Sequence, residues 1–118
     1  MEHLNENIDY QKIEEMVEGD EDFRRQLLEA IILAIEELRQ VYFQALEEEN
    51  VEAIKQARHK IKPTLSLFGL KRLTKVLYVG KKVILEEGFQ HSALDRHKEE
   101  LNEASEDLLN DLKAFHWL

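Results

Sequence analysis

The sequence contains no cysteine, a single proline, four glycines and few aromatic residues, which make up 8% of its 118 residues. The absence of cysteine excludes disulfides, thiolate metal sites and a cysteine nucleophile. The scarcity of proline and glycine, together with an almost complete lack of strand-forming segments, favours helices. A chain of this length forms one domain with one core, so we expect a single domain over residues 1–118.

Long apolar runs are also missing. The longest ones, such as Ala30 to Ile35, are far shorter than the ~20 residues that a membrane helix needs. The first residues have neither the basic start nor the apolar segment of a signal peptide. We therefore expect a soluble, cytoplasmic protein without a membrane partner. Its 43% hydrophobic residues recur periodically, which indicates a folded chain in spite of the 35% of charged residues.

The chain is acidic, with 25 acidic and 16 basic side chains and a net charge of −9, but the charges are unevenly distributed. The stretch from Ala53 to Leu85 contains no acidic residue. It contains nine bases, which are Lys55, Arg58, Lys60, Lys62, Lys71, Arg72, Lys75, Lys81 and Lys82. The rest of the chain has 25 acids and 16 − 9 = 7 bases, so the charge divides into +9 and −18. The overall acidity argues against a general nucleic-acid binder.

Breaks in the apolar periodicity predict where the helices end. Gly19, Gly69 and Gly88 fall at such breaks, and Asn50 marks a further junction. Asp20, Asn50 and Ser92 are candidate N-caps. The expected helices cover residues 8–18, 21–48, 51–68, 70–87 and 92–115.

Apolar residues at steps of three and four predict one buried stripe on each long helix. The stripe expected for 21–48 consists of Phe23, Leu27, Ala30, Ala34, Leu38, Val41 and Ala45. Gly80 falls on the stripe of 70–87, which indicates close backbone approach to a neighbour, and we expect His97 to be a hydrogen-bonded boundary residue. Because short loops make neighbouring helices antiparallel, the prediction is an all-α, antiparallel up-down four-helix bundle over about 20–116 with a short extra N-terminal helix.

His59 is the main candidate for chemistry. At ~100° per residue it lies roughly 160° from the centre of the apolar face of its helix, so it points to solvent. Lys55 and Lys62, four residues before it and three after it, share its outward stripe. Pro63 lies four residues after it, mid-helix, where a proline costs ~3 kcal/mol or more and leaves the His59 carbonyl without its donor.

The simplest interpretation is an ordinary surface histidine. Three features argue for a functional role of His59 instead. They are the two lysines, the unfavourable proline and the surrounding acid-free stretch. A neutral exposed imidazole is a good phosphoryl acceptor, because its ring nitrogen attacks phosphorus while nearby ammonium groups balance the added negative charge.

The run Ala57-Arg58-His59-Lys60-Ile61-Lys62-Pro63-Thr64, followed by Phe68-Gly69-Leu70 and Leu73, resembles the histidine-containing phosphotransfer (HPt) domain of two-component phosphorelays. That family has a histidine, an aliphatic residue two positions later, a lysine three positions later and usually a glycine four positions later. A stretch of small residues ending in an apolar-Gly pair normally follows, where Phe68-Gly69 falls here. Pro63 replaces the usual glycine, and Leu65 is larger than the usual small residue.

The resemblance implies that His59 accepts a phosphoryl group from the aspartyl phosphate of a receiver domain and passes it to another receiver. It assigns phosphoryl stabilisation to Lys62, with Lys55 as a weaker candidate. The implied partners are response-regulator receivers and a hybrid sensor kinase. Mg²⁺ is expected on the receiver, with no metal or cofactor in this chain. Without a glycine-rich nucleotide loop, we expect a carrier with no kinase activity of its own.

The outward faces of the two central helices are the expected docking surface, through Pro63, Ser66, Leu67 and Tyr78. We favour a monomer over a dimer and expect no nucleic acid as partner. Two alternatives stay open. One is a helical adaptor that binds a partner through the basic face without phosphorylation. The other is an RNA- or acidic-lipid-binding bundle, against which the lysines of residues 70–87 show no interleaved aromatics.

Overall fold

The computed structural model describes residues 6–116, and no strand occurs among them. Five helices fall within residues 10–116: α2 (Tyr10–Val17), α3 (Glu21–Glu47), α4 (Val51–Leu67), α5 (Lys71–Glu87) and α6 (Ser92–His116). The predicted all-helical class is confirmed for this part of the chain. The ends of the helices lie within two residues of the predicted ones.

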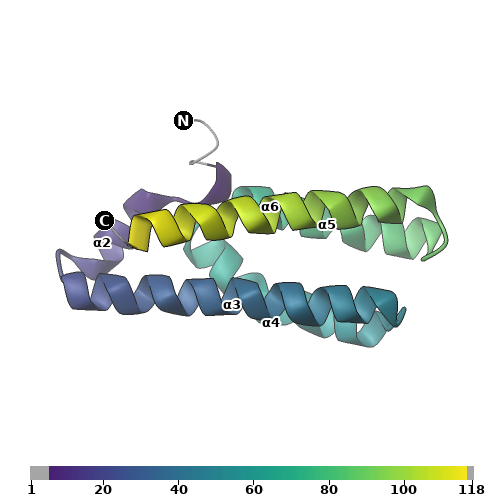
Figure 1. Cartoon of the computed structure of the whole chain (residues 1–118), viewed down its shortest axis with the longest axis horizontal. Coiled ribbons are helices and arrows are strands. Elements are labelled where there is room, and N and C mark those ends of the chain that lie inside the picture. Colours follow the sequence, from purple (N-terminus) through teal and green to yellow (C-terminus); the bar gives the residue numbers. More distant parts are fainter. Residues whose placement is uncertain (1–5, 117–118) are drawn as a thin grey trace.

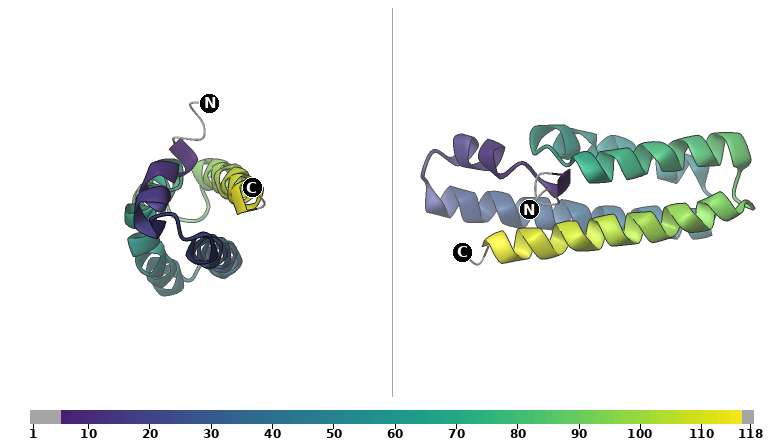
Figure 2. Two further views of the ribbon diagram at one scale, coloured as in Figure 1. Left: turned by 90° about the vertical axis from the view of Figure 1, so that its left-hand side faces the viewer. Right: turned by 90° about the horizontal axis from the view of Figure 1, so that it is seen from above.

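The helices form two layers that run along the long axis of the molecule. α3 and α6 lie side by side in one layer, and α2, α4 and α5 lie behind them (Figures 1 and 2). Within this arrangement α3 packs against both α4 and α6, while α5 packs mainly against α6. α4 and α5 contact each other only sparsely.

The short helix α2 compensates for a difference in helix length. α3 has 27 residues and α4 has 17, so α3 is ~15 Å longer at 1.5 Å per residue. α2 packs against α3, and Figure 2 shows it beyond the end of α4 in the same layer. The chain just before α2 is fixed to the α4–α5 turn, because the Asp9 amide donates to the Phe68 carbonyl at 3.0 Å.

Side-chain caps begin two of the long helices as predicted. The Asp20 carboxylate accepts from the Phe23 amide, and the Asn50 side-chain oxygen accepts from the Ala53 amide, both at 3.0 Å. The prediction for Ser92 is wrong, because Ser92 is the first helical residue of α6. His91 caps this helix instead, with its Nδ1 accepting from the Ala93 amide at 3.0 Å.

The predicted core stripe of α3 is wrong in part. Its residues Leu38 and Ala45 are buried, and Leu27 and Ala34 pack against the core. Phe23 and Val41 are exposed, at 42% and 43%, whereas the buried residues of α3 are Leu28, Ile31, Ile35, Leu38, Tyr42, Ala45 and Leu46. α3 has apolar residues on two adjacent faces. The face with the larger side chains removes more apolar surface from water, so it is the one turned inward.

Candidate functional site

α4 turns His59 towards solvent. The buried residues of this helix are Ile54, Ala57, Ile61 and Leu65, which lie on one face. His59 lies roughly 160° from the centre of that face by helix geometry, and its side chain is exposed. The exposure predicted for His59 from the sequence is therefore confirmed, whereas its chemical role stays a prediction.

The other candidate residues are on the surface as well. Lys55, Lys62, Pro63 and Ser66 are all exposed on α4. Leu67 and Tyr78 are exposed at 54% and 61%. Lys55, His59, Lys62 and Ser66 are spaced four, three and four residues apart, so they form one outward stripe.

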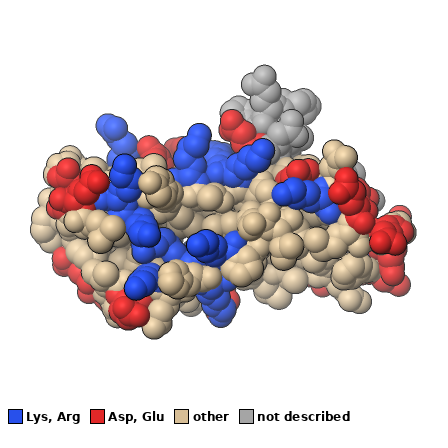
Figure 3. All heavy atoms as spheres, turned by 180° about the vertical axis from the view of Figure 1, so that it is seen from behind, with Lys and Arg blue, Asp and Glu red and all other residues tan. Residues whose placement is uncertain are grey.

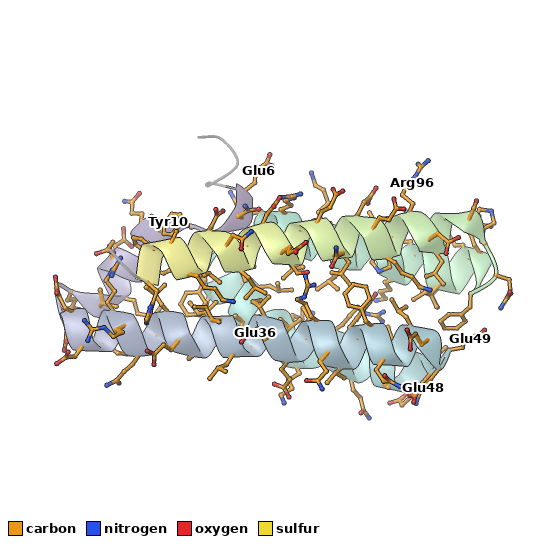
Figure 4. The ribbon with its side chains drawn as sticks, viewed as in Figure 1. Glu6, Tyr10, Glu36, Glu48, Glu49 and Arg96 are labelled. Carbon is orange, nitrogen blue, oxygen red and sulfur yellow. The ribbon has the colours of Figure 1, made fainter. Side chains whose placement is uncertain are left out.

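The acid-free stretch becomes one basic face. Figure 3 shows lysine and arginine gathered across the middle of the surface seen from behind, with acidic residues towards the ends. Among residues 6–116, two of its nine bases form ion pairs, Lys60 with Glu37 at 2.6 Å and Arg72 with Asp107 at 2.7 Å. Glu48 and Glu49 lie at the end of α3 (Figure 4), and the Glu48 carboxylate accepts from the Gln44 side-chain amide at 3.0 Å. The face around His59 therefore keeps most of its positive charge.

A groove between α3 and α4 was missed by sequence reasoning. It has a volume of about 390 Å³, and Lys60 and Gln56 lie along it beside apolar residues. Its depth comes from Ala34 on α3 and from Ala53 and Ala57 on α4, whose small side chains leave space between the helices. In the sequence, these alanines are the signal for the groove. The signal can be recognised only when it is known that α3 and α4 pack against each other.

A buried polar contact joins three helices. The Tyr42 hydroxyl of α3 lies 2.8 Å from His97 Nε2 of α6, and their exposed fractions are 0% and 1%. Gly80 of α5 lies against the imidazole, because a Cβ added there would lie 2.8 Å or less from three ring atoms. Burial raises the pKa of Tyr42 to about 12, against the opposing effect of the Arg58 charge and hydrogen bond.

This contact tests two predictions. The close approach predicted for the backbone of Gly80 is confirmed, and the neighbour is the His97 imidazole. His97 is a core residue and not a boundary residue, and its Nδ1 has no hydrogen-bond partner among the described residues. The apolar environment strongly favours the neutral ring. Burial and, to a smaller extent, the Arg58 charge lower the pKa of His97 to about 4.

We expect His97 to make the free energy of unfolding depend on pH. Its pKa is about 4 in the folded protein and 6.5 when unperturbed, so the unfolded chain binds more protons between these values. Stability contributed by the neutral ring is complete above pH 6.5 and falls as the pH is lowered, with a total loss of about 3 kcal/mol. Urea unfolding at a series of pH values measures this loss.

The variant His97→Gln is the control, since its side chain does not titrate while the carboxylates of the protein still do. Its stability is expected to change less than that of the wild type over the same pH range. Equal pH dependence of the two proteins would contradict a buried, neutral His97.

No group of three or more His, Asp or Glu residues in the part of the chain described is arranged to hold a metal ion. In the same part, every helix is too short or too polar to span a membrane. Searches for similar proteins among family models, curated proteins and solved structures find no match to the chain.

Proposed function

We propose that the protein is a histidine phosphotransfer carrier, with phosphohistidine forming at His59. One observation carries the proposal. His59 is exposed in the middle of α4, on one stripe with Lys55 and Lys62, within a stretch of sequence, Ala53 to Leu85, that has no acidic residue. This is the environment that an imidazole nucleophile needs, and the HPt-like spacing to Lys62 and Gly69 adds to it.

The proposed reaction is a transfer from one carboxylate to another through the imidazole. A neutral ring nitrogen of His59 attacks the phosphorus of an aspartyl phosphate on a receiver domain. The N–P bond forms while the bond to the aspartate oxygen breaks, and the electron pair leaves with the carboxylate. The second ring nitrogen carries the positive charge that forms and releases its proton to solvent. Attack by the aspartate of another receiver reverses these steps.

The basic face supplies the charge that this reaction requires. Phosphoryl transfer depends mainly on positioning and on neutralising the charge of the phosphoryl oxygens. Lys62 is the group proposed to hold these oxygens, and Lys55 has the weaker role on the preceding turn. Receiver active sites are acidic, so the same lysines favour docking of the partner.

The proposal also includes the arrangement of the helices, the partners and the cellular location. We infer an antiparallel up-down four-helix bundle formed by α3 to α6, supported by their short turns and by the contacts of α3 with α4 and α6. The proposed partners are cytoplasmic receiver domains and a hybrid sensor kinase, which meet a monomer through Pro63, Ser66, Leu67 and Tyr78. Mg²⁺ belongs to the receiver in this scheme.

The test is to incubate the protein with a phosphorylated receiver domain and to examine the label that it takes up. We expect a label that is lost in acid and retained in alkali, as for a phosphoramidate. A label of the opposite stability, or no label from any receiver of the same cell, would reject the proposal. Binding of the receiver without label would favour the adaptor function, and a salt-sensitive complex with RNA would favour the nucleic-acid alternative.

A further inference from the structure

Pro63 lies inside α4, at a position where a helix normally makes a hydrogen bond. The amide of residue 63 would donate to the carbonyl of His59, four residues earlier, but proline has no N–H. Residues 59–67 remain helical in spite of this. The His59 carbonyl is thus deprived of its helical donor on the same turn as the exposed imidazole.

Neither packing nor helix termination explains the proline. Pro63 is exposed, so its ring adds little to the core. α4 continues for four residues after Pro63 and ends through other groups. The Phe68 amide donates to the Thr64 carbonyl at 3.2 Å, and the Leu70 amide donates to the Leu65 carbonyl at 3.0 Å, around Gly69 with its φ of 61°. Neither core packing nor helix termination therefore offsets the loss of helix stability that an interior proline causes.

The freed carbonyl is accessible to a partner. It belongs to the exposed side of α4, where helix carbonyls tilt towards water. In residues 6–116 no side chain donates to it, and the nearest lysine in sequence, Lys60, is bound to Glu37 at 2.6 Å. A carbonyl without its helical donor, next to the ring proposed to accept the phosphoryl group, is a specific hydrogen-bonding feature of this surface.

We propose that Pro63 determines partner specificity by keeping the His59 carbonyl free to accept a hydrogen bond from the docking receiver. The donor on the receiver is an ammonium, hydroxyl or amide group beside its active site. This inference rests on the proposed phosphotransfer function. A receiver with such a donor gains one hydrogen bond here, which an HPt-like surface with an unbroken helix does not offer.

The test uses Pro63→Ala and Pro63→Gly, both of which restore the amide donor to the His59 carbonyl. We expect both variants to melt at a higher temperature than the wild type. Their dissociation constant for the receiver that labels the wild type, activated with beryllofluoride, is expected to rise about 5-fold. Unchanged or tighter binding of both variants would overturn the inference.

Two further proteins separate the carbonyl from other effects. Asn110→Ala, at an exposed position of α6 in the opposite layer, increases helix propensity without touching α4 and should bind the receiver as the wild type does. A semisynthetic protein with lactic acid at position 63 has neither the ring nor the N–H. It retains wild-type affinity if the carbonyl is recognised, and weak binding by it would show that the ring is contacted instead.

The two levels of the proposal fail in different ways. A wild type that takes up no label rejects both the phosphotransfer function and the inference that depends on it. A labelled wild type whose Pro63 variants bind the receiver equally well rejects the role of Pro63 alone.

Discussion

His59→Gln is expected to take up no phosphoryl label from any receiver that labels the wild type. Glutamine has a similar polarity but no nucleophilic ring nitrogen, so the N–P bond cannot form. Because His59 is exposed and contributes nothing to the core, the variant should keep the unfolding free energy of the wild type within about 0.5 kcal/mol. Labelling with a phosphorylated receiver and urea unfolding are the two measurements.

His91→Gln is the matched control. His91 is also exposed, but it precedes α6, where its ring caps the helix, and it is not on the basic face. We expect it to be labelled as fast as the wild type and to be slightly less stable. Full labelling of His59→Gln would show that the acceptor is another residue. A His59→Gln protein that still binds the receiver would show that docking and chemistry are separable, as the basic face predicts.

Most of the helical framework was predictable because its signals are local. Asp20 and Asn50 cap the helices that follow them, and glycine at 69 and 88 has the positive φ that ends a helix. These features depend on residues within one turn of each other, so they can be read without knowing the packing.

The face that a helix buries is less local. In α3 the sequence offers Leu27 beside Leu28 and Val41 beside Tyr42, so two stripes satisfy the same periodicity. The choice depends on which stripe the neighbouring helices cover, and α4 and α6 cover the one that contains Leu28 and Tyr42. A repeat weighted by side-chain volume would have favoured the correct stripe.

In the candidate site too, local features were predictable from the sequence and contacts between helices were not. The outward direction of His59 follows from helix geometry. α4 has only one apolar stripe, which must face the core, and His59 lies on the opposite side of the helix. The charge pattern of the sequence agrees with this surface, since seven of the nine bases of α4 and α5 are exposed, and Figure 3 shows lysine and arginine gathered on the side seen from behind. The contact of Tyr42 with His97 could not be derived, because it requires the relative heights of three helices.

Gly80→Ala is expected to lower the free energy of unfolding by about 1–3 kcal/mol, as the balance of overpacking, a lost hydrogen bond and a gain in helix propensity. The added methyl group would overlap the His97 ring, which has no space to move because it is 1% exposed and bonded to Tyr42. Overpacking costs about 1–3 kcal/mol, and the lost hydrogen bond adds about 1 kcal/mol. An alanine at an ordinary helix position would instead stabilise the protein by up to about 1 kcal/mol. Urea unfolding of the variant measures the difference.

The same substitution should have the opposite sign when the imidazole is absent. In a His97→Ala protein the space above Gly80 is empty, so Gly80→Ala is expected to increase the free energy of unfolding by about 1 kcal/mol through helix propensity. The two effects of Gly80→Ala then differ by about 2–4 kcal/mol in a double-mutant cycle, which residues without contact do not show. Equal effects in both backgrounds would mean that α5 is not seated on His97. Since α4 contacts α5 only sparsely, the packing of α5 on α6, to which this ring contributes, holds the lysines of α5 beside the face that carries His59.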